Sequence, residues 1–170
     1  MSLIMKIVSG KHVNPEAVAN VIRYIHTGAM KLPEHERLFG CMGFPADSDP
    51  ESVIEGMMMT KRIFEAEDGV QCKHFVISFG ERPRLSRKKR RKLMMRIAGF
   101  WKDQYQIFWG VHHNVTEKGE NYHVHIMLNS VNMKTGKRIN ITKKTWKKFV
   151  KSANRTWNEA LKRLDEPAGR

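Results

Sequence analysis

The segment at 122–129, Tyr-His-Val-His-Ile-Met-Leu-Asn, constrains the fold more than any other feature of the chain. Its two alternating sets are Val124, Ile126 and Leu128 against His123 and His125. Successive side chains of a β-strand point to opposite faces, so the pattern predicts a strand with one face in an apolar core. The two imidazoles then lie side by side on the other face, where they can share one metal ion.

A second strand-like segment, at 105–113, lies just upstream and ends in a pair of histidines. Its alternating sets are Ile107, Trp109 and Val111 against Phe108 and Gly110. Continuing that parity puts His112 on the side of the paired imidazoles and His113 on the core side. Gly110 is expected to leave room for a ligand above the sheet. We therefore predict a metal site with His113 as the alternative third ligand and with these preferred ligands: His112, His123 and His125.

The three imidazoles also indicate what kind of metal would bind. Neutral imidazole suits Mn, Zn, Ni or Co better than Mg, and three protein ligands leave positions open for phosphate oxygens. We expect one divalent metal ion, Mn, Mg or Zn. In the alternative interpretation the histidines are ordinary sheet-surface or DNA-contacting residues.

The composition indicates the class of partner and the compartment. The chain has 170 residues and a formal charge of +14, which implies a polyanion as partner: DNA, RNA or an acidic membrane surface. Cys41 and Cys72 are too few for a secreted disulfide framework, and their spacing is not that of a zinc site. Since the sequence has no signal peptide and no apolar run near the length of a membrane span, we expect a cytoplasmic protein without membrane contact.

The positive charge is concentrated where a helix is expected to begin, after Ser86. This basic block is predicted to bind DNA and consists of Arg82, Arg84, Arg87, Lys88, Lys89, Arg90, Arg91 and Lys92. Positive charge in a first helical turn opposes the helix dipole, at a cost of about 0.3–1 kcal/mol per residue, so a phosphate partner explains the block better than folding does. A second basic set lies on the last predicted helix, where DNA contact and a solvated face are equally good interpretations: Lys143, Lys144, Lys147, Lys148 and Lys151.

Strand and helix patterns alternate irregularly along the chain. Strands are predicted at 3–8, 74–79, 105–113, 122–129 and 138–141. Helices are predicted from Asn14-Pro15 to Gly28 and after Asp49-Pro50, Ser86 and Thr142, with 29–49 as a long loop. This mixture predicts an α+β fold with an antiparallel five-stranded sheet and helices packed mainly on one face. The other face would carry His74, Ser78, His123, His125 and Asn129. We expect one domain over 1–166, and 167–170 as the cut end of a longer protein.

These features together resemble the HUH endonuclease superfamily. The resemblance rests on His-x-His-x-x-x-Asn at 123–129, on the upstream histidine and on the basic α+β domain. Replication initiators and small transposases of that superfamily place their tyrosine after the paired histidines, and this chain has no tyrosine after Tyr122. Relaxases of conjugative and mobilisable elements place it near the N terminus, and 21–25, around Tyr24, resembles their first motif. Their second and third motifs resemble the segments 73–79, 111–114, 123–132 and 135–137.

The resemblance implies a relaxase fold, HUH-relaxase-like, and a relaxase activity. Tyr24 is then the nucleophile, with His26 in reserve because some relaxases use histidine. A metal polarises the scissile phosphate of single-stranded DNA at a transfer origin, and the cut leaves a free 3′-hydroxyl and a 5′-phosphotyrosine link. Accessory relaxosome proteins are further expected partners. Three residues are expected to hold DNA or loop geometry near the site: Asn129, Asn132 and Lys137.

The chain departs from the relaxase pattern after the upstream histidine, where His113-Asn114 replaces the usual Thr-Asp. The acidic residue that would orient the ligands therefore has no assignment in the sequence. Two other functions fit the same features: a noncatalytic nucleic-acid-binding module on this fold, or a metal-dependent nuclease that uses water and keeps Tyr24 as a structural residue.

Overall fold

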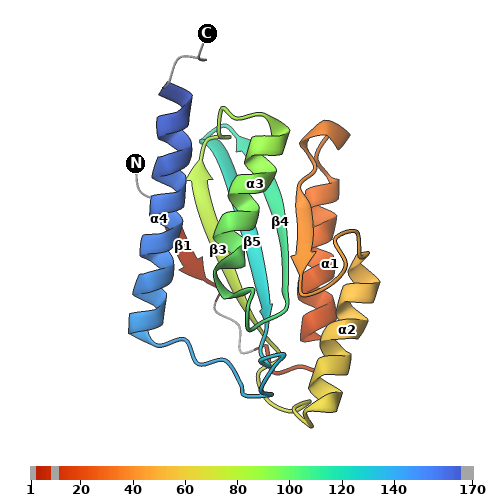
Figure 1. The fold of residues 1–170 in the computed structure, drawn as a ribbon. Helices are drawn as coiled ribbons and strands as arrows, with labels where there is room; N and C mark the ends of the chain where they lie inside the picture. The colour runs from red at the N-terminus through yellow and green to blue at the C-terminus, as the bar shows by residue number, and fades with distance from the viewer. Residues whose placement is uncertain (1–2, 9–11, 166–170) are drawn as a thin grey trace.

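The computed structural model describes residues 3–8 and 12–165 (Figure 1). Within them, five strands form one antiparallel sheet in the order β1-β3-β5-β4-β2. The strands are β1 (Ile4–Ile7), β2 (Phe39–Met42), β3 (Cys72–Gly80), β4 (Ile107–Thr116) and β5 (Gly119–Asn129). The helices are α1 (Ala17–Met30), α2 (Pro50–Ile63), α3 (Arg87–Ala98) and α4 (Lys143–Asp165), with short 3-10 turns η1 (Glu34–Glu36) and η2 (Gly99–Trp101). The predicted cut end at 167–170 lies outside the described residues.

The centre of the sheet is the hairpin of β4 and β5, whose turn contains Gly119 at a positive φ of 117°. Only glycine adopts that backbone conformation without strain. β3 pairs with the other edge of β5, so β5 has a long strand on each side. The pairing register follows from the alternation of apolar and polar residues, because a slip of one residue would move the apolar set out of the core.

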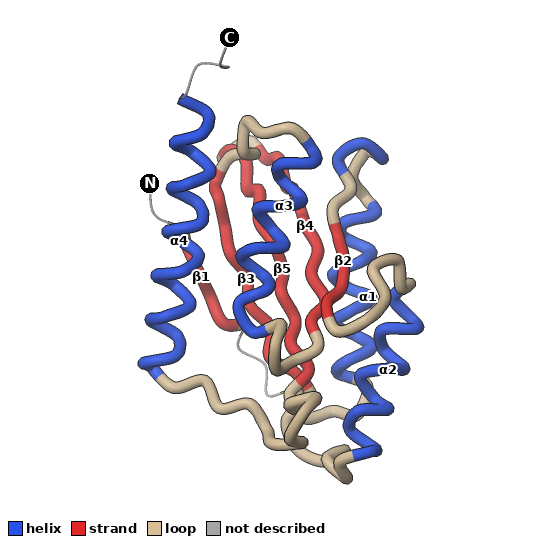
Figure 2. The backbone as a smooth tube through the Cα atoms, viewed as in Figure 1, coloured by secondary structure: helices blue, strands red, loops and turns tan. Residues whose placement is uncertain are grey.

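Helices cover both faces of the sheet (Figure 2). α3 and α4 pack on the face of the larger core, which contains Phe75, Ile126 and Trp109, while α1 and α2 pack on the opposite face around Phe108 and Met127. The α+β class and the five-stranded antiparallel sheet are confirmed, but the expectation of helices mainly on one face is wrong. The physical reason is the amphipathic pattern of α1 and α2, whose apolar stripes also have to be buried.

The predicted position of the fifth strand is wrong. Residues 138–141 do not form a strand and contribute only a single bridge, between Val131 and Arg138. The fifth strand is β2, which lies inside the predicted 29–49 loop and pairs with β4 at the edge of the sheet. Four residues are too few to show an alternation, so the sequence carried little signal for β2.

The predicted caps of α2 and α3 are confirmed. Asp49 accepts a hydrogen bond from the backbone N–H of Ser52 at the start of α2, and Ser86 does the same for Lys89 at the start of α3. α1 begins at Ala17, after the predicted start at Asn14-Pro15, and continues past the predicted end at Gly28 to Met30. No helix in the described part of the chain is long and apolar enough to cross a bilayer.

Candidate metal centre and nucleophile

Strand register brings three histidines together on one face of the sheet. His112 pairs directly with His123 across the β4–β5 hairpin, and His125 lies opposite Gly110. The ring centroids of His112 and His125 are 4.2 Å apart, those of His123 and His125 4.9 Å, and those of His112 and His123 5.5 Å. One nitrogen from each ring lies within 4.8 Å of the others, so the three buried histidines could hold one metal ion.

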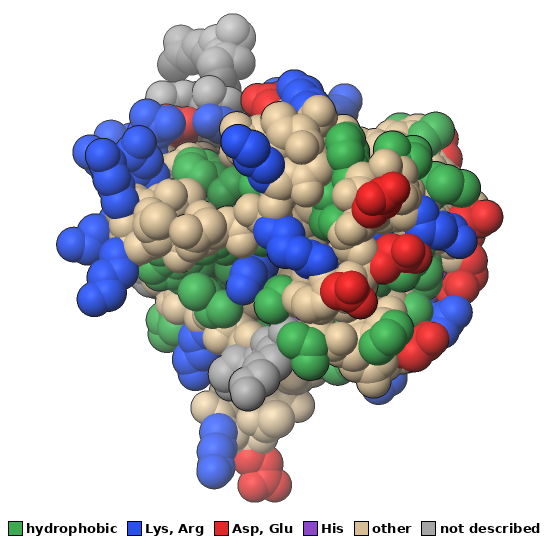
Figure 3. Space-filling view, turned by 90° about the horizontal axis from the view of Figure 1, so that it is seen from below, with side chains coloured by type: hydrophobic (Ala, Val, Ile, Leu, Met, Phe, Trp, Pro, Cys, Tyr) green, Lys and Arg blue, Asp and Glu red, His purple; other side chains and the backbone are tan. Residues whose placement is uncertain are grey.

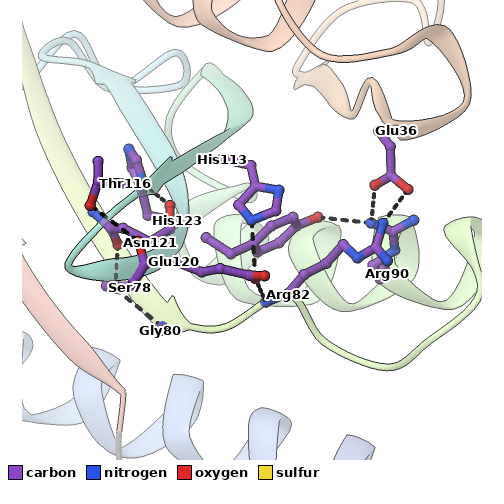
Figure 4. A network of polar contacts seen from close by, with 12 residues as sticks. Glu36, Ser78, Gly80, Arg82, Arg90, His113, Thr116, Glu120, Asn121 and His123 are labelled. Atoms are coloured by element: carbon purple, nitrogen blue, oxygen red, sulfur yellow. Dashed lines mark hydrogen bonds and ion pairs between the residues drawn. The ribbon is translucent and has the colours of Figure 1, made fainter.

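His113 lies on the other face, as the parity of β4 predicts. Its ring lies against Tyr122, with 5.4 Å between the centroids, and its Nε2 is 3.2 Å from a carboxylate oxygen of Glu120 (Figure 4). Tyr122 is fully buried in the larger core. His113 is therefore separated by the sheet from the three clustered rings.

Hydrogen bonds to backbone carbonyls fix the tautomers of two of the clustered rings. Nε2 of His112 donates to the carbonyl oxygen of Ile25 at 3.0 Å, and Nδ1 of His123 donates to that of Asn121 at 3.0 Å. A carbonyl only accepts, so the hydrogens lie on these nitrogens, and Nδ1 of His112 and Nε2 of His123 keep their lone pairs. Nε2 of His125 is buried without any partner. These three nitrogens, one from each ring, are free to act as metal ligands, and the residues present fit a divalent ion.

His74 completes the cluster from β3, and sequence reasoning gave it no role. Its Nε2 lies 2.9 Å from Nδ1 of His125, and its side chain is buried. With Nε2 of His125 turned to a metal, Nδ1–H of His125 donates to His74. An imidazole thus occupies the orienting position for which no acidic residue could be assigned. The sequence signal was available, because His74 shares the predicted polar face of the sheet with His125.

Burial controls the charge of this cluster. It is the largest cause that lowers the pKa of His74 to about 4 and that of His125 to about 2, and neighbouring imidazoles lower both further. Burial also lowers the pKa of His112 and His123, although their hydrogen bonds to backbone carbonyls act in the opposite direction. All four rings are therefore neutral at pH 7, the form that binds a metal.

Two glycines allow α1 to lie directly against the cluster. A Cβ on Gly28 would overlap the imidazole of His112, and a Cβ on Gly110 would come within 2.7 Å of Cγ2 of Ile25. The space above Gly110, which was expected to hold a ligand, is thus occupied by Ile25. The close approach places Tyr24, one residue before Ile25, beside the histidines.

Tyr24 has 56% of its surface exposed, although it contacts the buried rings. Its ring centroid is 5.3 Å from those of His112 and His125 and 6.3 Å from that of His74. Surface hollows lie on both sides of it: one is lined by His12, Asn14 and His74, among others, and the other by Arg23, Lys31 and Asn114, among others. The phenol is therefore accessible to a strand that crosses the cluster.

His26 lies elsewhere on α1. Its ring packs against Phe39 at 4.8 Å between centroids, in a hollow that also contains Arg37, Arg87 and Arg91. The structure thus brings Tyr24, and not the reserve residue, against the clustered histidines.

The basic block at the start of α3 divides into two groups. Four arginines have intramolecular partners: Arg82 and Arg90 pair with Glu36, Arg87 donates to the carbonyl of Arg37, and Arg91 donates to that of Phe39 (Figure 4 draws the Glu36 pairs). Burial acts to raise the pKa of Glu36, but the hydrogen bond and charge of Arg90, together with Arg82, hold it below its ordinary value. Arg90 is buried, so folding does use part of this charge. The other four members of the block, Arg84, Lys88, Lys89 and Lys92, are exposed.

Asn129, Asn132 and Lys137 are the residues that were expected to hold DNA or loop geometry near the site. Nδ2 of Asn129 donates to the carbonyl of Met57 at 3.2 Å and to Oε1 of Gln106 at 2.9 Å, and the residue is fully buried. Oδ1 of Asn132 accepts from the backbone N–H groups of Lys134 and Thr135. The contacts of Asn132 are those of loop geometry, whereas the contacts of Asn129 join the end of β5 to α2 and to Gln106. Lys137, the third member of that group, is exposed.

Fold and cluster together define a class of protein: an antiparallel α+β domain with three convergent histidines and a tyrosine on a helix packed against them. A family model, the nuclease domain of MobA/VirD2-like relaxases, matches residues 24–160. The chain therefore belongs to the MobA/VirD2-like relaxase family, and the predicted relaxase resemblance is confirmed. No curated protein matches the chain significantly. Membership implies a nuclease domain that acts on single-stranded DNA.

Proposed function

We propose that this chain is a site- and strand-specific nickase that cuts single-stranded DNA at a transfer origin through a covalent link to Tyr24. The observation that carries the proposal is the exposed phenol of Tyr24 beside three buried imidazoles with convergent lone pairs. A family match alone would not select a nucleophile. The contact between α1 and the cluster favours Tyr24 over His26.

His112, His123 and His125 would hold the divalent metal, which supplies positive charge that polarises the scissile phosphate. The tautomers set by Ile25 and Asn121 leave Nδ1 of His112 and Nε2 of His123 free to bind the metal. His74 orients His125 through their hydrogen bond. With three neutral ligands, the open positions suit phosphate oxygens.

In the proposed reaction the Tyr24 oxygen attacks phosphorus in line with the leaving 3′ oxygen. The bond from phosphorus to the 3′ oxygen breaks as the bond to the phenol oxygen forms. The phenol loses its proton, and the 3′ oxygen gains one to become a hydroxyl. Because one phosphodiester replaces another, the link stores the energy needed to reseal the strand.

The remaining parts of the proposal follow from this activity. The DNA surface would comprise Arg84, Lys88, Lys89, Lys92 and Lys137, and Lys31 beside Tyr24 adds positive charge near the phosphate. A transfer-origin nickase of a conjugative or mobilisable plasmid works in the cytoplasm with accessory relaxosome proteins. We propose 1–166 as the domain that carries it.

The test is a covalent adduct. Single-stranded oligonucleotides of random sequence, labelled at the 3′ end, are incubated with the protein and Mn²⁺ and analysed on denaturing gels. We expect a labelled protein band that Tyr24→Phe abolishes and that His26→Ala retains. Tyr105→Phe is the matched control, because it removes a phenol oxygen from a buried residue outside the cluster.

Other outcomes select the alternatives. An adduct that persists in Tyr24→Phe and disappears in His26→Ala assigns the nucleophile to the histidine. Cleavage without an adduct identifies a nuclease that uses water. Binding without cleavage identifies a noncatalytic nucleic-acid-binding module.

A further inference from the structure

The outer face of α4 carries a continuous stripe of positive charge. We call it the α4 basic face; its members are all exposed: Lys143, Lys144, Lys147, Lys148, Lys151 and Arg155. They recur three or four residues apart, so they line one side of the helix. At 1.5 Å per residue the stripe is about 18 Å long.

Folding does not explain this stripe. In the described residues, no ion pair links any of its members to an acidic side chain. Lysines four apart repel one another, and α4 has no acidic residue in its first turn to balance those at its start. The opposite side of the helix supplies the packing, through Trp146, Phe149 and Trp157. The stripe therefore lowers the stability of the isolated domain, and an external polyanion would compensate it.

The α4 basic face is separate from the candidate nicking site. α4 packs on the larger core, on the sheet face opposite the clustered histidines, so a strand seated at Tyr24 does not lie along it. Figure 3 shows Lys and Arg gathered on the side of α4 and most Asp and Glu side chains toward α1 and α2. The exposed acids there include Glu51, Glu55 and Glu67. This asymmetry orients the α4 side toward a polyanion and the α2 side away from it.

Further exposed positive charge lies on α3, beside the C-terminal part of α4. A groove between α3 and α4 is lined by Lys89, Lys92 and Arg96, among others. Lys88 and Arg84 are also exposed, and no ion pair in the described part of the chain includes them. The α4 residues of that groove are Glu159, which pairs with Arg96, and Ala160, so these basic side chains of α3 lie beside the C-terminal part of α4, beyond the α4 basic face.

We propose that the α4 basic face binds duplex DNA adjoining the single strand that is cut at Tyr24. That this duplex adjoins a strand cut at Tyr24 rests on the proposed function. That the α4 basic face binds duplex DNA does not. A straight, rigid stripe fits a duplex better than a second single strand. Duplex DNA carries one charge per about 1.7 Å of axis, and its phosphates are already ordered before binding.

The test compares two triple variants of the full chain that remove equal charge. One is Lys147→Gln with Lys148→Gln and Lys151→Gln, on the α4 basic face. The control is Lys102→Gln with Lys118→Gln and Lys134→Gln, at scattered exposed positions. Glutamine has nearly the helix propensity of lysine, so α4 should keep its helicity, which circular dichroism checks. Affinity for a duplex of arbitrary sequence is measured over a range of salt concentrations.

We expect the slope of log affinity against log salt to decrease by about 2.7 in the α4 variant, from about 0.9 for each lost phosphate contact. The control should change it by less than one. The α4 variant should still form the Tyr24 adduct on short single strands. Equal changes in both variants, or an α4 variant that loses single-strand affinity alone, would overturn the proposal.

An unchanged duplex affinity in the α4 variant would also contradict the proposal. The α4 basic face would then be a solvated surface or a binding site for an acidic protein. Failure of the proposed function is separately visible. Tyr24→Phe should keep its duplex affinity, so a protein that binds duplex without forming an adduct retains this inference and loses the nickase assignment.

Discussion

At the scale of single residues, the candidate metal centre depends on which nitrogen of each imidazole carries the hydrogen. The carbonyls of Ile25 and Asn121 decide this for His112 and His123, and for His125 a metal at Nε2 would place the hydrogen on Nδ1, where His74 accepts it. Backbone carbonyls cannot be removed by substitution. His74 is therefore the position at which the orientation of a ligand can be tested.

We predict that His74→Ala weakens Mn²⁺ binding about 10- to 100-fold, because residues that orient metal ligands typically contribute that much. His74→Gln should recover part of the loss, since its amide oxygen can still accept from Nδ1–H of His125. Isothermal titration with Mn²⁺ measures both. His35→Ala is the control, as it removes an exposed imidazole elsewhere. If His74→Ala binds Mn²⁺ as the unmodified chain does, His74 has no positioning role.

At the scale of elements, the decisive contact is between α1 and the central hairpin. Gly28 and Gly110 lie on either side of that contact and permit the helix to approach the cluster. The distance between Tyr24 and the histidines is set by this packing and not by any direct hydrogen bond that the structure records for the phenol.

Gly28→Ala distinguishes packing from helix propensity by the sign of its effect. Propensity alone would stabilise α1 by about 1 kcal/mol. We predict instead a destabilisation of about 1–3 kcal/mol, because the new methyl group overlaps the imidazole of His112 and forces the helix outward. Urea unfolding measures the change, and the Tyr24 adduct should decrease with it. A more stable variant would show that α1 is not held against His112.

At the scale of the whole molecule, Glu36 joins the segment before β2 to α3 around the edge of the sheet. Arg90 is buried beside it, and Arg87 and Arg91 bond the carbonyls of Arg37 and Phe39 in the same region. These contacts tie α3 to the segment that runs from η1 into β2. Part of the charge that appeared free in the sequence is therefore structural.

Glu36→Gln should lower the free energy of unfolding at pH 7 by about 3–5 kcal/mol, because it leaves Arg90 buried without its counter-charge. Glu51→Gln is the matched control, since its pair with Arg23 is exposed and should contribute less than about 1 kcal/mol. Denaturant unfolding of both variants gives the comparison. Equal losses would contradict a structural role for Glu36.

The same pair gives a pH dependence. The pKa of Glu36 is lowered in the folded state, so its stabilisation is present above the unfolded value near 4.5 and disappears as the pH falls through the folded pKa. The difference between the unmodified chain and Glu36→Gln should therefore shrink below about pH 4.5. A difference that stayed constant down to pH 3 would contradict the assignment.

Strong periodicity made the strands and their faces predictable. The alternation in β5 and β4 selected His112 over His113 before any contact was known, because side chains alternate strictly along a strand. β2 could not be predicted because it is short, and the bonds of Arg90 could not because Glu36 is far from it in sequence. The role of His74 depended on which strand pairs with β5, and local pattern does not give that pairing.

The sequence by itself determined which residues share a face, where most helices begin and that the chain is strongly basic. Tertiary structure alone decided that α1 lies over the histidines, that Arg82 and Arg90 share the carboxylate of Glu36, and that the lysines of α4 face away from the clustered rings. The physical reason is the distance along the chain over which each kind of interaction acts. Side-chain alternation and helix capping act over a few residues, whereas docking of a helix on a sheet and pairing of buried charges depend on contacts between distant segments.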